Sequence, residues 1–144
     1  RLFTEVREKR GLCYAVFARY SGQRDRGVVV GYAGTTPERA QQTLDVLQSE
    51  MQRLSQGVDE SEFQRATVGM KSRLVMQGES SAARAGAIAS DVFLIGRPRS
   101  LDERSAAVDA LTLKQLNDYV AANRPEAMTV VTLGPDALDV GSTV

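Results

Sequence analysis

The chain contains few of the side chains that usually carry hydrolytic chemistry. Its 144 residues include no histidine and a single cysteine, Cys13. A Ser–His–Asp or Cys–His nucleophile system needs an imidazole as its base, and zinc sites are usually built from several imidazole or thiolate ligands. These counts exclude a complete nucleophile system of this kind, and they predict that the chain holds no zinc or other cofactor of its own.

Three other groups of residues have an ordinary structural explanation. Gly31 and Gly34 are spaced like part of a phosphate-binding loop, but the P-loop lysine and the third glycine of a dinucleotide fingerprint are missing. A turn from a strand into a helix explains this spacing better. The acidic stretch Asp59–Glu62 lies where a helix is expected to begin, so capping is favoured over acid–base catalysis. Cys13 is expected to be a small buried apolar residue.

The charge and hydrophobic composition limits the kinds of partner that the chain is expected to bind. The chain has 18 basic and 18 acidic residues, so its formal net charge is zero. Proteins that bind nucleic acid usually carry a basic excess, and a membrane span needs about 18–20 apolar residues in a row. Neither feature is present in the sequence, so no nucleic-acid or membrane partner is expected.

The N-terminal third is patterned as a helix followed by a hairpin. Residues 1–10 place Leu2, Phe3 and Val6 on one face of a helix that should end at Gly11. Cys13–Ser21 and Val28–Ala33 are predicted to be strands that pair antiparallel across a turn bounded by glycines. Within the first strand, alternation should separate two sets of side chains: Tyr14, Val16, Ala18 and Tyr20 on one side, and Cys13, Ala15, Phe17 and Arg19 on the other.

The rest of the chain is predicted to be mainly helical. A helix should begin at Thr36-Pro37 and pack on one face of the hairpin through an apolar stripe, which consists of Ala40, Leu44, Leu47, Met51 and Leu54. Further helices are expected after Asp59, Ser80, Ser100 and Thr112, and a last strand is expected over Met128–Leu133.

These elements indicate an α+β fold, with an antiparallel sheet and helices packed on one face. We expect one domain over residues 1–135 and a tail over 136–144. The chain opens inside an apolar-periodic stretch without a methionine, so we expect it to be a fragment of a longer protein.

One stretch resembles a known family. Arg1–Val16 reads RLFTEVREKRGLCYAV, and it matches every fixed position of the signature R-L-F-x-x-x-R-E-x-x-G-L-x-Y-x-V. This signature is typical of the C-terminal domain of the pitrilysin/insulinase zinc metallopeptidases, the inverzincins, which include mitochondrial processing peptidase. The resemblance extends more weakly over nearly the whole chain, and it implies the half-peptidase fold of that family.

The resemblance also implies a division of labour. In this family a homologous N-terminal domain carries the zinc-binding HxxEH helix, and the C-terminal domain closes a chamber over the substrate. The implied partners are a zinc-bearing N-terminal domain or partner subunit, a peptide substrate and, in a dimer, a second subunit. A bacterial source is implied, with the cytoplasm and the periplasm both open as compartments.

Arg7 and Tyr14 are the site residues that the resemblance implies, because the family's Arg and Tyr at these positions reach toward the zinc site of the partner domain. A guanidinium and a phenol hydroxyl suit the negative charge that develops on a carbonyl oxygen during peptide hydrolysis. In the structural alternative, Arg7 complements the dipole at its helix end and Tyr14 is a core ring with a solvated hydroxyl.

The expected function is that of a non-catalytic domain that binds substrate and forms the chamber of a zinc-dependent endopeptidase acting on unfolded peptides. The alternative is a structural or assembly subunit of the same fold without proteolytic activity. A third interpretation is an unrelated α+β binding module.

Overall fold

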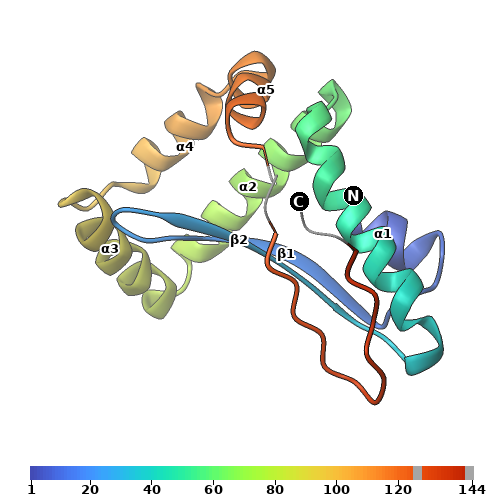
Figure 1. Ribbon diagram of the computed structural model, residues 1–144. Coiled ribbons are helices and arrows are strands. Elements are labelled where there is room, and N and C mark those ends of the chain that lie inside the picture. The colour runs from blue at the N-terminus through green and yellow to red at the C-terminus, as the bar shows by residue number, and fades with distance from the viewer. Residues whose placement is uncertain (125–127, 142–144) are drawn as a thin grey trace. The chain divides into compact units, whose positions relative to one another are not determined.

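The computed structural model describes residues 1–124 and 128–141 (Figure 1). A short N-terminal helix is followed by two strands and then by helices. The elements are η1 (Phe3–Glu8), β1 (Ala15–Gly22), β2 (Gly27–Gly34), η2 (Pro37–Arg39), α1 (Ala40–Arg53), η3 (Leu54–Gln56), α2 (Glu60–Gly78), α3 (Ser81–Ile95), α4 (Leu101–Asp109) and α5 (Leu113–Ala122). This is a mixed α+β fold with a two-stranded antiparallel sheet, which confirms the predicted fold class.

The residues fall into two compact units. The first contains Arg1–Ser21, Val28–Gln56 and the chain from Val120 onward, and the second contains Gly22–Gly27 and Gly57–Tyr119. Each unit is built around its own contacts.

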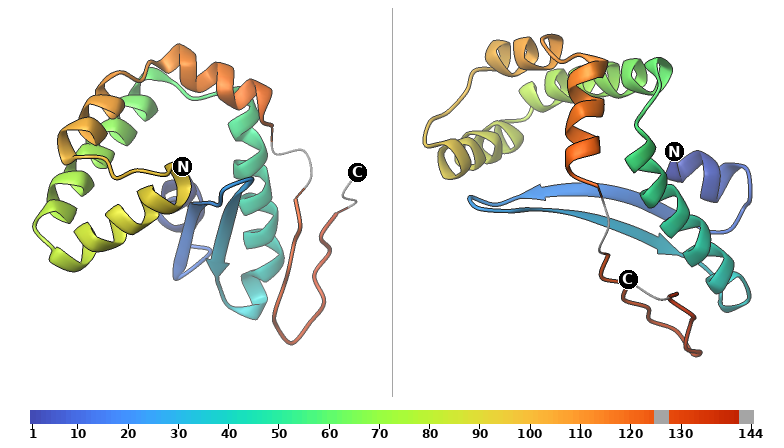
Figure 2. Two further views of the ribbon diagram at one scale, coloured as in Figure 1. Left: turned by 90° about the vertical axis from the view of Figure 1, so that its left-hand side faces the viewer. Right: turned by 45° about the horizontal axis from the view of Figure 1, so that its top comes forward.

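In the first unit, α1 runs along the hairpin of β1 and β2 (Figure 2). A Cβ atom added at Gly31 of β2 would lie 3.6 Å from Sδ of Met51 and 3.7 Å from Cδ1 of Leu47. Leu44 and Met51 are buried. The predicted hairpin and the apolar stripe on α1 are therefore confirmed, because the stripe faces β2 where a glycine lets the helix approach closely.

The N-terminal helix is shorter than the predicted residues 1–10: η1 ends at Glu8, a turn follows, and the chain changes direction at Gly11. Gly11 has φ +59°, in the left-handed region that favours glycine, and its amide donates to the Arg7 carbonyl at 3.0 Å. The helix is a π-helix rather than an α-helix, and Lys9 N–H donates to the Thr4 carbonyl at 2.9 Å. Val6 is fully buried, whereas Phe3 is exposed, so the prediction that Phe3 shares the buried face was wrong.

The first strand begins at Ala15, two residues later than predicted. Cys13 lies in the buried cluster with Val6 and Leu12, and Val16 packs against the same cluster. The sequence placed Cys13 and Val16 on opposite sides of a regular strand. That alternation fails because residues 12–14 form a connection that has not yet entered the strand.

The second unit contains α2, α3 and α4. Its α2 begins with a capping box: Oδ1 of Asp59 accepts from Glu62 N–H at 2.8 Å, and Oε2 of Glu62 accepts from Asp59 N–H at 3.2 Å. The capping explanation of the acidic stretch Asp59–Glu62 is therefore confirmed.

The predicted strand over Met128–Leu133 was wrong. These residues have no regular secondary structure, and the side chains of Val131 and Leu133 are exposed. The only sheet in the described parts of the chain is the β1–β2 hairpin. A strand is stable only when a neighbour pairs with its backbone groups, and an apolar alternating sequence does not supply that neighbour.

Candidate functional site

Arg7 lies on η1 and is exposed. Its Cζ atom is 5.1 Å from the centroid of the Phe3 ring, which is within cation–π range. The exposed Phe3 ring therefore lies beside the guanidinium. In residues 1–124 and 128–141, Arg7 forms no salt bridge.

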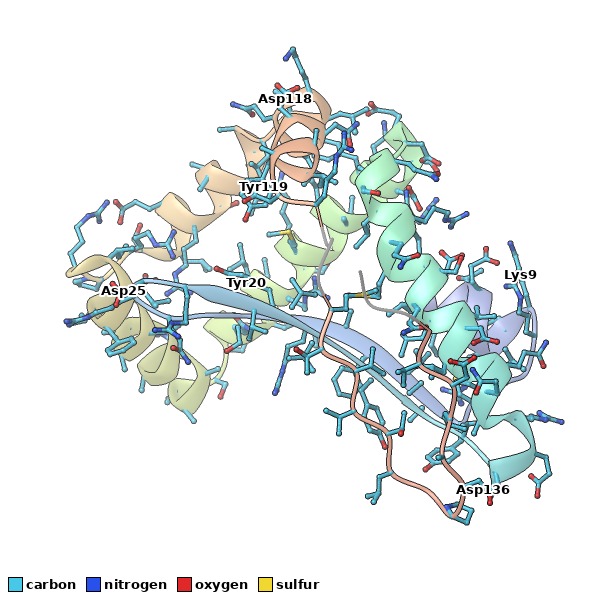
Figure 3. All side chains as sticks on the ribbon, in the orientation of Figure 1. Lys9, Tyr20, Asp25, Asp118, Tyr119 and Asp136 are labelled. Carbon is cyan, nitrogen blue, oxygen red and sulfur yellow. The ribbon has the colours of Figure 1, made fainter. Side chains whose placement is uncertain are left out.

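The other two cations near the end of this helix are already paired. Lys9 Nζ lies 2.7 Å from Oε1 of Glu5, and Arg10 Nη1 lies 2.8 Å from Oε2 of the same side chain; Lys9 is labelled in Figure 3. Hydrogen bonds from Lys9 and Arg10 lower the pKa of Glu5 to about 2. Glu5 therefore stays ionised and occupied, and the Arg7 guanidinium is left available for another anion.

Tyr14 lies immediately before β1 and its side chain is 67% exposed. Its backbone N–H donates to the Gly34 carbonyl at 3.0 Å, so Tyr14 is held opposite the last residue of β2. Its ring lies directly over Gly34, where a Cβ atom would be 2.7 Å from Cζ of the ring. The hydroxyl forms no hydrogen bond within the part of the chain that the structure describes. The prediction of an accessible Tyr14 therefore agrees with its position.

The connection between Arg7 and Tyr14 is anchored to the start of α1. The Leu12 carbonyl accepts from Oγ1 of Thr35 at 2.5 Å, and the Gly11 carbonyl accepts from Nη1 of Arg39. Oγ1 of Thr43, which is buried, lies 2.8 Å from the Arg39 carbonyl and 3.2 Å from the Leu12 carbonyl. Its single hydrogen is donated to one of these oxygens at a time. This arrangement fixes the backbone just ahead of Tyr14.

The Tyr14 ring lies on the hairpin face that points away from α1. Residues 31 and 34 of a strand point to opposite faces, and a side chain at Gly31 would meet α1. Tyr32 shares the face of Gly34 by the same rule, and it stacks on Phe17 with ring centroids 5.2 Å apart. An exposed aromatic face therefore carries Tyr14, Phe17 and Tyr32. Because β2 ends at Gly34 and η2 begins at Pro37, the Gly31–Gly34 spacing marks a turn from strand to helix, as predicted.

No hydrogen bond joins Arg7 to Tyr14 within the described residues, and Cys13 lies between them in the sequence. Burial raises the pKa of the Cys13 thiol, and the positive charge of Arg7 opposes this shift. Cys13 is buried in the core cluster, which confirms the expectation of a small apolar residue rather than a reactive thiol.

The described residues do not fit a zinc site. Zinc sites in proteins need three or four nitrogen, sulfur or oxygen ligands in one place. There is no histidine in the sequence, and the described residues contain no group of three or more Cys, Asp or Glu side chains that could hold a metal ion. None of the described helices is both long and apolar enough to cross a membrane.

Comparisons with known proteins identify relatives of two kinds. Residues 1–67 match the model of the peptidase M16 inactive domain. The uncharacterized zinc protease YmxG of Bacillus subtilis is 30% identical over 136 residues, which cover 94% of this chain and 33% of that protein. A probable mitochondrial-processing peptidase subunit alpha-2 of Arabidopsis thaliana is 32% identical over 112 residues, which cover 77% of this chain and 22% of that protein.

Two solved structures share the fold. The periplasmic protease PqqL from Escherichia coli superposes with a TM-score of 0.62 and 21% identity, covering 83% of this chain and 14% of that one. A chain of complex III2 from Candida albicans superposes with a TM-score of 0.70 and 24% identity, covering 85% of this chain and 29% of that one.

The chain spans about a third or less of the length of these curated relatives. The stretch that matches the family model, residues 1–67, contains the whole pattern of Arg1–Val16. The chain belongs to the peptidase M16 family of zinc proteases and corresponds to its C-terminal inactive domain.

Proposed function

We propose that this chain is the domain that binds substrate and forms the chamber of a zinc-dependent endopeptidase acting on unfolded peptides. In this proposal Arg7 and Tyr14 donate hydrogen bonds to the substrate carbonyl oxygen as it gains negative charge. The observation that carries the proposal is that both side chains are exposed and form no hydrogen bond or ion pair with the described residues, while the backbone between them is anchored.

The two donors suit this task for different reasons. Arg7 offers a planar, permanently charged group, and its acidic neighbour Glu5 is already occupied by Lys9 and Arg10. Tyr14 offers a neutral hydroxyl on a rigid ring whose position is set by Gly34. Fixed donors stabilise a developing oxyanion more strongly in a closed site than in water, because they need no reorganisation during the reaction.

The zinc would have to come from elsewhere, because the residues present here do not form a zinc site. We infer that a zinc-bearing domain, either in the same polypeptide or in a partner subunit, faces this domain across the substrate. The relatives support this inference, since one is named a zinc protease and another a subunit of a processing peptidase. A dimer would bring two such halves together.

A structural role without proteolysis is the second candidate. Two contacts favour it: Arg7 stacks on Phe3, and Tyr14 covers Gly34. An aromatic ring placed over a glycine of the neighbouring strand can stabilise a sheet edge by itself. In that case both side chains would hold the fold of an assembly subunit, and their polar atoms would have no substrate to meet.

Conservative substitutions in the full-length protein, assayed together with its zinc-bearing half, separate the two candidates. Tyr14→Phe removes one donor and keeps the ring, and it should lower kcat by about 100- to 1,000-fold, as losses of an oxyanion donor do. Tyr20→Phe is the matched control, because Tyr20 lies on β1 and is 68% exposed, close to the 67% of Tyr14. It should leave kcat within about twofold of wild type.

Arg7→Lys keeps the charge but loses the planar fork, and it should also lower kcat. Arg10→Lys is its control, since Arg10 is occupied by Glu5. If Tyr14→Phe and Arg7→Lys both cleave peptide as fast as their controls, the two residues are structural and the assembly role is correct.

A further inference from the structure

We infer that Gly34 is a positioning residue for Tyr14: the missing side chain at Gly34 creates the space in which the ring lies and thereby fixes the direction of the hydroxyl. This inference rests on the proposed function for its catalytic consequence. The contact of the Tyr14 ring with Gly34 can be measured without an activity assay.

The space over Gly34 is filled by the end of the Tyr14 side chain. A Cβ atom at Gly34 would lie 2.7 Å from Cζ, 2.8 Å from Cε2 and 2.8 Å from the hydroxyl oxygen of Tyr14. These separations are far shorter than the 3.5–4.0 Å at which carbon atoms attract one another. Any side chain at position 34 would therefore push away the hydroxyl end of the ring, which is the end that would meet a substrate.

Backbone conformation does not explain the glycine. Gly34 is not among the glycines with positive φ, which are Gly11, Gly57, Gly96 and Gly141. An alanine would adopt the backbone conformation of Gly34 without strain. The requirement for glycine at this position comes from the ring above it, so a substitution should act on Tyr14 before it acts on the strand.

Gly31, three residues earlier on β2, provides an internal comparison. It also lacks a positive φ, and a Cβ atom there would lie 3.6 Å from Sδ of Met51, an ordinary van der Waals contact. Gly31→Ala therefore makes the same chemical change in the same strand without touching Tyr14. The two glycines differ in their neighbours: side chains of α1 lie over Gly31, and the Tyr14 ring lies over Gly34.

The effect of Gly34 on activity would pass through the hydroxyl. Tyr14 is fixed on one side by Gly34 and by the hydrogen bond from its own N–H to the Gly34 carbonyl, while its other side is exposed. A displacement of about 1 Å of a catalytic group can cost about 100-fold in rate. Gly34→Ala should therefore lower kcat by about 10- to 100-fold and leave KM nearly unchanged, because a transition-state donor would be misplaced.

The ring contact is measured first, by NMR on the full-length protein labelled with 13C at the glycine α carbon. The Gly34 Hα resonance, identified by its loss in Gly34→Ala, should be displaced from its ordinary value by the ring current of Tyr14 and should return to that value in Tyr14→Leu. If Gly34→Ala does not fold, the Gly34 resonance is assigned through its backbone neighbours instead. The comparison of wild type with Tyr14→Leu then still tests the ring contact. An unshifted Gly34 resonance in wild type would overturn the inference.

The catalytic consequence is measured on Gly34→Ala, Gly31→Ala, Tyr14→Phe and the double variant Gly34→Ala/Tyr14→Phe. We expect Gly31→Ala to stay within about twofold of wild type, and the double variant to be no slower than Tyr14→Phe alone, because no hydroxyl is left to misplace. A double variant slower by the full product of the single effects would show that Gly34 acts independently of the hydroxyl and would overturn the inference.

The two proposals fail in different ways. An unchanged kcat in Tyr14→Phe would overturn the proposed function. An impaired Tyr14→Phe together with an unimpaired Gly34→Ala would overturn the role of Gly34 alone.

Discussion

Asp91 of α3 should be the most important charged residue for the stability of the second unit. Its side chain is buried, and both carboxylate oxygens are used. Nη2 of Arg99 lies 2.7 Å from Oδ1, while Nη2 of Arg104 lies 2.7 Å from Oδ2. The backbone N–H of Arg99 also donates to Oδ2, at 3.0 Å. The carboxylate therefore ties the start of α4 to the middle of α3.

The expected cost of Asp91→Asn follows from what the substitution leaves behind. Removing one partner of a buried ion pair costs about 3–5 kcal/mol when the remaining charge stays buried. Here the Arg99 side chain is 38% exposed and can turn to water, whereas Arg104 is 17% exposed. We therefore expect a lower value, about 2–3 kcal/mol, which corresponds to about a 30- to 150-fold change in the local opening equilibrium.

Amide hydrogen exchange followed by mass spectrometry measures this opening in the full-length protein. Peptides from α3 and α4 should exchange about 30- to 150-fold faster in Asp91→Asn, and peptides from α1 should not change. The matched control is Asp118→Asn, because Asp118 pairs with Lys114 at 2.6 Å with both side chains largely exposed. An exposed pair of this kind contributes about 0.3–0.5 kcal/mol. Equal increases in exchange rate for Asp91→Asn and Asp118→Asn would show that the buried network stabilises the unit no more than an exposed ion pair does.

The acid sensitivity of this network has a definite sign. Hydrogen bonds from Arg99, followed by those from Arg104, hold the pKa of Asp91 well below its usual range, against the opposing effect of burial. The contribution of Asp91 is therefore complete above the ordinary carboxyl pKa of about 3.9 and is lost as the pH falls below it. In Asp91→Asn, the protection of α3 and α4 against hydrogen exchange should no longer fall with pH below about 3.9 on account of this carboxylate.

Two further predictions concern the anchoring of the segment ahead of Tyr14. Thr43→Val removes the buried hydroxyl near the Arg39 and Leu12 carbonyls. It should lower the local stability of the N-terminal turn of α1 by about 1–2 kcal/mol, as measured by hydrogen exchange, and Thr43→Ser should lower it less. Protection equal to wild type in Thr43→Val would contradict this. In an NMR titration, the midpoint of Glu5 should lie near its pKa of about 2, because Lys9 and Arg10 stabilise its carboxylate. The ion pairs of Glu5 are complete above the ordinary carboxyl pKa of about 4.3 and are lost as the pH falls toward 2. A midpoint above 4 would show that these ion pairs do not form in solution.

Local signals in the sequence predicted the parts of the fold that depend on nearby residues. Gly11 follows the first helix because a left-handed residue is needed where the chain changes direction, and Asp59 begins α2 because its carboxylate can accept from the third residue of the helix. The hairpin and the stripe on α1 are also set by short-range pattern and by the period of the apolar residues.

Predictions that depended on distant partners failed. The alternating residues of Met128–Leu133 form no strand, since no neighbouring strand pairs with them among the described residues. Phe3 was assigned to the core by its spacing, yet it supports Arg7 at the surface. Spacing shows which residues share a helix face, but it does not show whether a charged neighbour will use an aromatic ring.

Arg7 and Tyr14 were found through the resemblance of Arg1–Val16 to a family signature, because their residue types alone favoured a structural role. Gly34 was missed as a contact of Tyr14, since the Gly31–Gly34 spacing was explained by a turn from a strand into a helix. The predicted second strand ended at Ala33, so the backbone hydrogen bond from Tyr14 to Gly34 could not be read from the sequence.

The most direct test of the central claim compares a tetrahedral mimic of the transition state with the substrate itself. A phosphinate peptide presents negatively charged oxygens where the substrate carbonyl would be, and its affinity for the full-length protein with its zinc-bearing half can be measured alongside that of the uncleaved peptide. If Tyr14 donates to the developing oxyanion, Tyr14→Phe should weaken the phosphinate by the same factor as kcat/KM falls, about 100- to 1,000-fold, and leave affinity for the peptide unchanged. Equal weakening of both ligands, or of neither, would contradict the account.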